Sequence, residues 1–247
     1  MNSSCIVYRL GSTLIDTGPP NQWRMVKRFV QERDVRRALI THHHEDHSGN
    51  AARLKQEMHA DVFVPQRGLE LMRSGFHLHP YQRIIWGTPG RFEPRASPEE
   101  TTLEGGLRLR AVAAPGHSPD MTCYLEPARG WLFTGDLYIT SRPRFMRADE
   151  DVDDQIESLR RVSGLEFKTV FCAHRGVVSD GRRAIRAKLD HLVSLRDEVR
   201  RLHGEGRTVG EITRSLSGRE NHLSLITLYD FSKRNLVRGC LPRSTAR

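Results

Sequence analysis

Apolar and polar positions in the N-terminal part of the chain alternate between strand-like runs and helical spacings. The strand-like runs lie at residues 5–10, 12–16, 35–41 and 61–65, and the helical spacings at 21–34 and 48–59. Gly11 separates the first two runs, which therefore predict a hairpin closed by that glycine. Ser48 is a residue type favoured at helix starts, so we expect the second helix to begin there.

The same alternation returns after an irregular stretch. Residues 75–101 contain several Pro, Gly and His residues without a clear period, which predicts a loop or a lid. Strand-like runs follow at residues 107–113, 121–125, 131–134 and 169–172, and a helical spacing at 151–162. Two successive series of strands and helices predict an α/β fold in which two sheets pack together and helices cover the outside.

The run at 169–172 is expected to be the last strand, and helices follow it. Helical segments are predicted there at residues 182–203, 208–216 and 222–237. Thr208 and Glu211 form the Thr-x-x-Glu pattern of a capped helix start. We therefore divide the chain into an α/β domain at residues 1–178 and a basic helical C-terminal extension at residues 179–247.

The composition is typical of a soluble globular protein. Of the 247 residues 37% are hydrophobic and 28% are charged, and no apolar run approaches the length of about 18 residues that crosses a membrane. The first residues lack the features of an export signal. The four cysteines are scattered without Cys-x-x-Cys spacing, which indicates free thiols in a reducing compartment. We expect a cytoplasmic protein.

The net charge of +9 is concentrated near the C-terminus. Residues 179–247 hold 15 basic and 8 acidic side chains and thus +7 of the total. A basic region of this kind attracts anionic partners, nucleic acid among them. The alternative is that arginine-rich helices simply present solvated faces.

The chemistry is concentrated in one short segment, Thr41-His-His-His-Glu-Asp-His47. An extended backbone points alternate side chains to one face, so His42 and His44 can hold one metal ion. If the chain then turns, Asp46 and His47 can reach a second ion. Imidazole and carboxylate ligands suit zinc, and they are compatible with iron or manganese.

Further ligand types stand at the ends of predicted strands. His117 lies in a Pro-Gly turn after the run at 107–113, Asp136 follows Gly135 after the next-but-one run, and His174 follows the run at 169–172. Ligands at one edge of packed sheets converge on one cleft. A site for two metal ions is therefore expected.

These motifs, taken in order, resemble those of the metallo-β-lactamase superfamily. The motifs are Thr-His-x-His-x-Asp-His, Pro-Gly-His, Gly-Asp and a strand-terminal His, and residues 15–18 (Ile-Asp-Thr-Gly) match the usual second strand of that superfamily. The resemblance spans about residues 5–178, the whole predicted catalytic domain. It implies a four-layer αββα sandwich.

The resemblance also implies a role for each matched residue. The first metal would be held by His42, His44 and His117, the second by Asp46, His47 and His174, and Asp136 would bridge both. A bridging carboxylate is similar to the glyoxalase II and lactonase type of site and argues against true β-lactamases.

Further expectations concern a catalytic role for two residues and the orientation of three residues near the motifs. Asp46 is placed to orient the attacking water and take its proton. Tyr138 can donate a hydrogen bond to a developing oxyanion, or it is an aromatic side chain packed beside the site. His43 and Glu45 should point away from the ligand face, and Asp16 should be a structural carboxylate near the site.

Three functions remain open on this reasoning. The first is a metal-dependent hydrolase of a small-molecule ester, thioester or lactone, because a zinc-bound water loses its proton near about pH 7 and becomes a nucleophile. The alternative is cleavage of phosphodiester bonds in nucleic acid, motivated by the basic extension. A mononuclear iron dioxygenase is disfavoured because His47, Asp136 and His174 complete a second site. The substrate, the metal and the oligomeric state cannot be deduced from the sequence.

Overall fold

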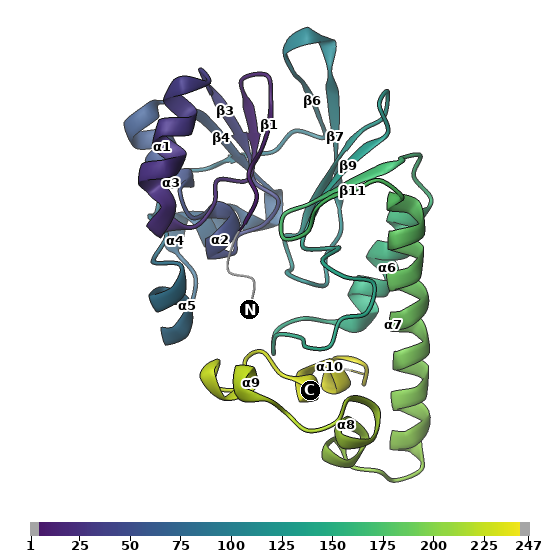
Figure 1. Cartoon of the computed structure of the whole chain (residues 1–247). Coiled ribbons are helices and arrows are strands. Elements are labelled where there is room, and N and C mark those ends of the chain that lie inside the picture. Colours follow the sequence, from purple (N-terminus) through teal and green to yellow (C-terminus); the bar gives the residue numbers. More distant parts are fainter. Residues whose placement is uncertain (1–4, 243–247) are drawn as a thin grey trace.

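Two β-sheets lie face to face in the computed structural model, which describes residues 5–242 (Figure 1). The first sheet has the order β1-β2-β3-β4-β5, with β1 antiparallel to β2 and the other pairs parallel. Its strands are β1 Tyr8–Leu10, β2 Thr13–Ile15, β3 Arg37–Leu39, β4 Asp61–Val64 and β5 Arg95–Ala96. Gly11 has a positive φ of 59° between β1 and β2, as the predicted hairpin requires.

The second sheet has the order β11-β10-β9-β8-β7-β6 and is antiparallel except between β9 and β10. Its strands are β6 Glu100–Thr102, β7 Arg108–Ala113, β8 Thr122–Glu126, β9 Trp131–Gly135, β10 Thr169–Cys172 and β11 Gly176–Val178. Between the two sheets lies a buried apolar layer to which Ile15 and Leu39 contribute from the first sheet and Leu109, Tyr124 and Phe133 from the second.

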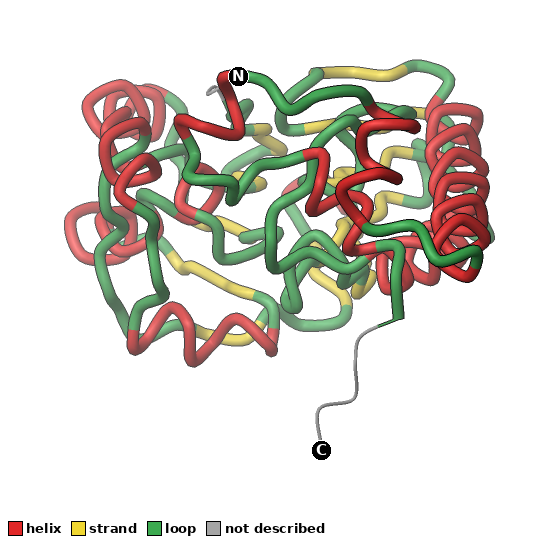
Figure 2. Tube along the Cα trace, turned by 90° about the horizontal axis from the view of Figure 1, so that it is seen from below, coloured by secondary structure: helices red, strands yellow, loops and turns green. Residues whose placement is uncertain are grey.

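Helices cover the outer face of each sheet. Helices α1 (Trp23–Glu32) and α3 (Ala51–Met58) pack on the first sheet, and α6 (Val152–Ser163) and α7 (Gly181–Gly204) on the second. Seen from below, the helices flank the strands on both sides (Figure 2). The predicted four-layer αββα architecture is confirmed.

Short helices complete the described chain. They are α2 Glu45–Ser48, α4 Leu69–Ser74, α5 Pro80–Ile85, α8 Val209–Ser217, α9 His222–Ile226 and α10 Lys233–Gly239, with single 3₁₀ turns at Pro20–Gln22, Gln66–Gly68 and Glu104–Gly106. Thr208 caps α8 through a reciprocal box with Glu211, as predicted. Among the helices of residues 5–242, none is long and apolar enough to cross a bilayer.

Several local predictions were wrong. The helix predicted from Ser48 begins at Ala51, because the Ser48 hydroxyl donates to the carbonyl oxygen of His43 at 2.6 Å and Ser48 instead ends α2. The predicted loop at 75–101 contains α5, β5 and the start of β6. The run at 169–172 is not the last strand, because β11 pairs with it as the edge of the second sheet. The helix predicted at 222–237 is interrupted between α9 and α10, where Leu228 and Tyr229 have positive φ angles.

The helical extension is continuous with the packing of the second sheet. On α7, Ile185, Leu189 and Leu192 belong to the same buried cluster as Ile156 of α6. The C-terminal helices are present as expected, but a domain division after residue 178 stays a prediction. Figure 1 shows α9 and α10 below the end of the sheets that carries α2.

Candidate metal centre

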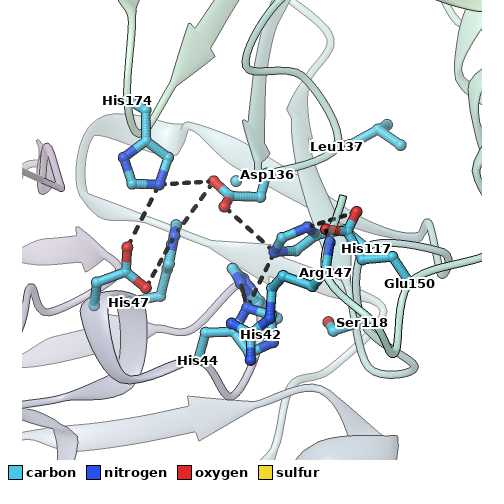
Figure 3. Close-up of polar contacts among 12 residues, drawn as sticks. His42, His44, His47, His117, Ser118, Asp136, Leu137, Arg147, Glu150 and His174 are labelled. Carbon is cyan, nitrogen blue, oxygen red and sulfur yellow. Dashed lines mark hydrogen bonds and ion pairs between the residues drawn. The ribbon is translucent and has the colours of Figure 1, made fainter. Parts of the chain in front are cut away.

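Each predicted ligand stands just beyond the end of a strand, at one edge of the two sheets. His42 and His44 lie in the segment after β3, and Asp46 and His47 lie in α2. The others follow β7, β9 and β10 and are His117, Asp136 and His174. The structure brings all seven together, and all but His174 are buried (Figure 3).

Three imidazole nitrogens form the first group. His44 Nδ1 lies 3.0 Å from His42 Nε2 and 3.0 Å from His117 Nε2. Tetrahedral zinc with bonds of about 2.0–2.1 Å to nitrogen would set such ligand atoms roughly 3.3 Å apart. Two of the three separations are thus close to what one ion requires, and all three nitrogens lie within 4.8 Å of one another.

The second group is joined to the first by Asp136. Its Oδ1 lies 3.3 Å from His47 Nε2 and 3.1 Å from His174 Nε2, whereas its Oδ2 lies 3.3 Å from His117 Nε2. Asp46 contributes Oδ2 at 3.5 Å from His174 Nε2. Figure 3 shows the Asp136 carboxylate between His174 and His117.

Two buried atoms of this group have no hydrogen-bond partner among the described residues. They are His47 Nε2 and Asp136 Oδ1. These two atoms face each other at 3.3 Å without hydrogen-bond geometry, and an ion bound by both would satisfy them. The arrangement of imidazoles and carboxylates fits divalent metal ions.

Residues behind the ligands fix their orientation. The Asp16 carboxylate lies 2.8 Å from His47 Nδ1 and accepts from the backbone N–H of Thr41 at 2.7 Å. The Thr41 hydroxyl lies 3.0 Å from Nδ1 of His42. Because these contacts occupy Nδ1, they leave Nε2 directed into the site. Asp16, expected to be a structural carboxylate near the site, thus orients one of its histidines.

Electrostatics divide the histidines into two kinds. Burial disfavours the charged form of His42 and His44 and lowers the pKa of both. Burial also acts against the charge of His174, but Asp136 and Asp46 outweigh it and raise its pKa to about 9. The burial of Asp136 is likewise outweighed by three imidazoles, which hold its pKa well below the usual range. Asp136 is therefore ionised and can offer both oxygens to metal.

Of the two residues that alternate with the ligands in the motif, His43 points away from the ligands as expected and Glu45 does not. His43 turns away from the ligands, and its Nδ1 lies 2.8 Å from Asp120. Glu45 was expected to face away from the ligands. It instead lines a cavity that opens beside them, and its Oε1 accepts a hydrogen bond from Gln82 Nε2 at 2.8 Å. Tyr138 belongs to the large buried apolar cluster and is not among the residues that line this cavity, so its donor role stays a prediction without geometric support.

Three charged residues of the site were missed by the sequence reasoning, of which Lys188 is buried and Glu150 and Arg147 are half-buried. Glu150 Oε2 lies 3.3 Å from His117 Nδ1 and so orients that ligand. Arg147 lies beside the same histidines, and Lys188 Nζ donates to the carbonyl oxygen of Leu137 at 2.7 Å. Nothing in their local pattern separates them from surface charges, since Glu150 stands in an acidic run before a helix and Lys188 in a basic helix.

A cavity of about 270 Å³ opens beside the ligands. Its polar end includes Asp46, Asp136, His117 and His174. The remaining wall comes from residues 139–147, between β9 and α6, and from residues near α9. A small molecule can therefore reach the ligand group.

Comparison with known proteins agrees with this geometry. The family model of the metallo-beta-lactamase superfamily matches residues 2–174. The chain belongs to the metallo-β-lactamase superfamily. A metallo-beta-lactamase family protein from Thermus thermophilus has a solved structure that covers 95% of this chain and 85% of its own, with a TM-score of 0.69 and 19% identity. That likeness supports the metallo-β-lactamase fold.

Curated relatives include hydrolases of thioesters. Atrochrysone carboxyl ACP thioesterase of Aspergillus fumigatus is 26% identical over 177 residues, which are 70% of this chain and 50% of that protein. A hydroxyacylglutathione hydrolase of Legionella pneumophila is 30% identical over 166 residues, 65% of this chain and 57% of that enzyme. The chain spans about half the length of the curated relatives it matches. This member of the metallo-β-lactamase superfamily thus carries groups able to bind metal.

The basic C-terminal extension gains no support as a nucleic-acid surface. Along α7, Arg196 pairs with Asp197 at 2.8 Å, and Arg200 pairs with Asp153 at 2.5 Å. Local acidic partners of this kind reduce the field that a phosphate backbone would meet.

Proposed function

We propose that this protein is a dinuclear metal-dependent hydrolase, of the zinc type, that cleaves a small-molecule thioester. Esters and lactones are the related substrates of the same chemistry. The two metal ions would be held by the seven ligands described above, with Asp136 between them.

The proposal rests on the position of Asp136 between the two groups of ligands. Its two oxygens face two different ligand groups, Oδ2 toward His117 and Oδ1 toward His47 and His174. A carboxylate buried among three imidazoles is the arrangement expected of a bridging ligand. When bound, the two ions would lower the pKa of a water molecule and polarise the substrate carbonyl.

The protein's own groups supply positioning and proton transfer. Asp46 lines the cavity and is nearly buried, so its carboxylate can orient a water molecule and accept its proton. Glu150 holds His117, and Asp16 holds His47, in the ring orientation that the ligands need. Residues 139–147 and the C-terminal segment wall the cavity in which these groups act.

Thioesters are preferred over the other carbonyl substrates because of the relatives. Thioesterases and hydroxyacylglutathione hydrolases recur among the curated proteins that the chain resembles. These activities are named for proteins longer than this chain, so the thioester substrate is proposed here for this chain.

The test combines metal content with a substrate panel. Purified protein loaded with zinc is expected to hold about two ions per chain and to cleave chromogenic thioesters faster than matched lactones. Asp46→Ala is expected to lose most of the activity. Asp120→Asn is the matched control, because Asp120 is a buried carboxylate paired with a histidine of the same motif but outside the ligand set.

Two results would contradict the proposal. One is a protein without stoichiometric divalent metal that works equally well after Asp46→Ala. The other is salt-sensitive cleavage of RNA by a protein that leaves every thioester intact, which would favour the phosphodiester alternative.

A further inference from the structure

The cavity beside the ligands is lined by charged and by apolar side chains, and the cations Arg144, Arg147 and Lys188 are among the charged ones. The apolar ones, here called its apolar end, are Trp86, Ile139, Phe145, Met146, Leu223 and Phe231. The first follows α5, the next three lie between β9 and α6, and the last two belong to the C-terminal segment around α9. This end is thus assembled from three separate parts of the chain.

Two of the polar side chains that border the cavity are engaged within the protein, whereas Glu45 Oε2 and Arg147 Nε have no hydrogen-bond partner among the described residues. Gln155 donates to Glu150 Oε2 at 2.8 Å, and Lys188 donates to the carbonyl oxygen of Leu137 at 2.7 Å. The side chains of Gln155 and Lys188 therefore donate to the protein itself and not to a substrate. A substrate group placed at the apolar end would find few hydrogen-bond partners, which makes that end costly for an amide or a hydroxyl group and favourable for hydrocarbon.

The C-terminal segment is fixed over the cavity as a wall. Met146 and Ser232 exchange two backbone hydrogen bonds, each 3.1 Å long. The Tyr81 hydroxyl donates to Asp230 Oδ2 at 2.6 Å, which ties α5 to the same segment. Leu223 and Phe231 thus stand at defined positions.

We infer that the apolar end of this cavity is an acyl site, and that Leu223 and Phe231 set the length of the hydrocarbon acyl group that the enzyme accepts. The inference rests on the proposed thioester hydrolysis. The acyl chain occupies the apolar end, the carbonyl lies at the ligands, and the polar leaving group extends toward the mouth, where Arg144 is exposed.

The volume of the cavity sets the scale of that group. About 270 Å³ holds roughly nine water-sized groups of about 30 Å³ each. An acyl chain of roughly eight carbons would fill it. Each methylene that enters should raise kcat/KM about fourfold until the cavity is full, after which longer chains gain nothing.

The experiment measures kcat/KM of the zinc-loaded full chain on straight-chain acyl thioesters from two to sixteen carbons. The wild type is expected to have its optimum near about eight carbons. Leu223→Trp should move the optimum to chains shorter by roughly two carbons, and Phe231→Leu should move it to longer ones. Leu225→Trp is the matched control, because Leu225 lies on the same helix, is 61% exposed and does not line the cavity.

Calorimetric binding of octanoate provides a readout that does not depend on turnover. Leu223→Trp should weaken octanoate binding about tenfold or more, while Leu225→Trp leaves it unchanged. Circular dichroism and zinc content confirm that each variant is folded and loaded. If Leu223→Trp is not folded, Phe231→Leu alone still decides the direction of the shift.

The outcomes separate this inference from the proposed function. Hydrolysis with no dependence on acyl length, a steady fall in kcat/KM from two carbons upward, or an unchanged profile in folded Leu223→Trp and Phe231→Leu would overturn the acyl site alone. No hydrolysis of any thioester by the zinc-loaded wild type would contradict the proposed function itself.

Discussion

Replacing the central carboxylate tests the two-metal interpretation most directly. Asp136→Asn keeps the shape of the side chain but removes its negative charge and turns one oxygen into an amide group that cannot bind metal. Each ligand group would keep three protein ligands, either His42, His44 and His117 or Asp46, His47 and His174. The variant therefore isolates the contribution of the bridge.

The size of the effect follows from the charge that is lost. One negative charge about 4 Å from a unit positive charge is worth about 4 kcal/mol at an effective dielectric constant of about 20, and each ion would carry two positive charges. We expect metal binding weakened by about a thousandfold or more, and kcat/KM lowered on the order of a thousandfold. The bound metal should fall from about two ions per chain to about one or less.

The assay is elemental analysis after gel filtration, together with kcat/KM on one thioester at saturating zinc. Asp120→Asn serves again as the control and should leave both quantities within about twofold, since Asp120 pairs with His43 away from the ligands. If Asp136→Asn retained two ions and the activity of the wild type, the bridging role would be refuted.

Three further predictions concern a residue behind one ligand, a hydrogen bond that holds the C-terminal segment, and one of the ligands. Glu150→Gln removes the anionic partner of His117 and should weaken zinc binding about 10- to 100-fold, measured by competition with a chromogenic chelator; an unchanged affinity would contradict its positioning role. Tyr81→Phe removes the buried hydrogen bond to Asp230 and should lower the free energy of unfolding by about 2 kcal/mol in a denaturant titration, whereas a change below about 0.5 kcal/mol would argue against that tie. The pKa of His174 is raised to about 9 in the metal-free chain, so its stabilising contribution is complete below about pH 6.5 and is lost as the pH rises to about 9. Thermal unfolding in a chelator should therefore show a falling midpoint over this window, and a rising midpoint would contradict the sign.

Much of the architecture could be predicted because it depends on local pattern. The hairpin at Gly11, the amphipathic helix after it and the cap of α8 at Thr208 each depend on residues close in sequence. The secondary-structure predictions were wrong where contacts between distant residues determine the backbone conformation. Leu228 and Tyr229 adopt left-handed backbone angles inside an apparently continuous helical spacing, and the Asn235 side chain donates to the carbonyl oxygens of Tyr229 and Asp230 there.

The candidate ligands could be predicted from residue type and position, whereas the groups behind them could not. Histidines and carboxylates directly after strands are conspicuous in the sequence. Glu150 is distant from His117 in sequence and looks like one of several acids before α6, and its contact with His117 depends on how α6 packs on the second sheet. Long-range packing of this kind has no periodic signal.

The register between β9 and β10 explains why two of the ligands meet. These strands are parallel, and Phe133 pairs with Phe171, but the pairing then shifts so that Gly135 pairs with Cys172. Side chains alternate between the two faces of a strand, so a shift of one residue exchanges the face that each following side chain occupies. The irregularity thus sets which way the chain leaves β10, and His174 Nε2 comes to lie 3.1 Å from Asp136 Oδ1. Gly135 itself has a φ of 47°, and a Cβ there would stand 2.8 Å from Thr41 Oγ1 and 3.0 Å from Thr41 Cβ. The strand end that presents Asp136 therefore depends on a glycine and a shifted pairing as much as on the ligands themselves.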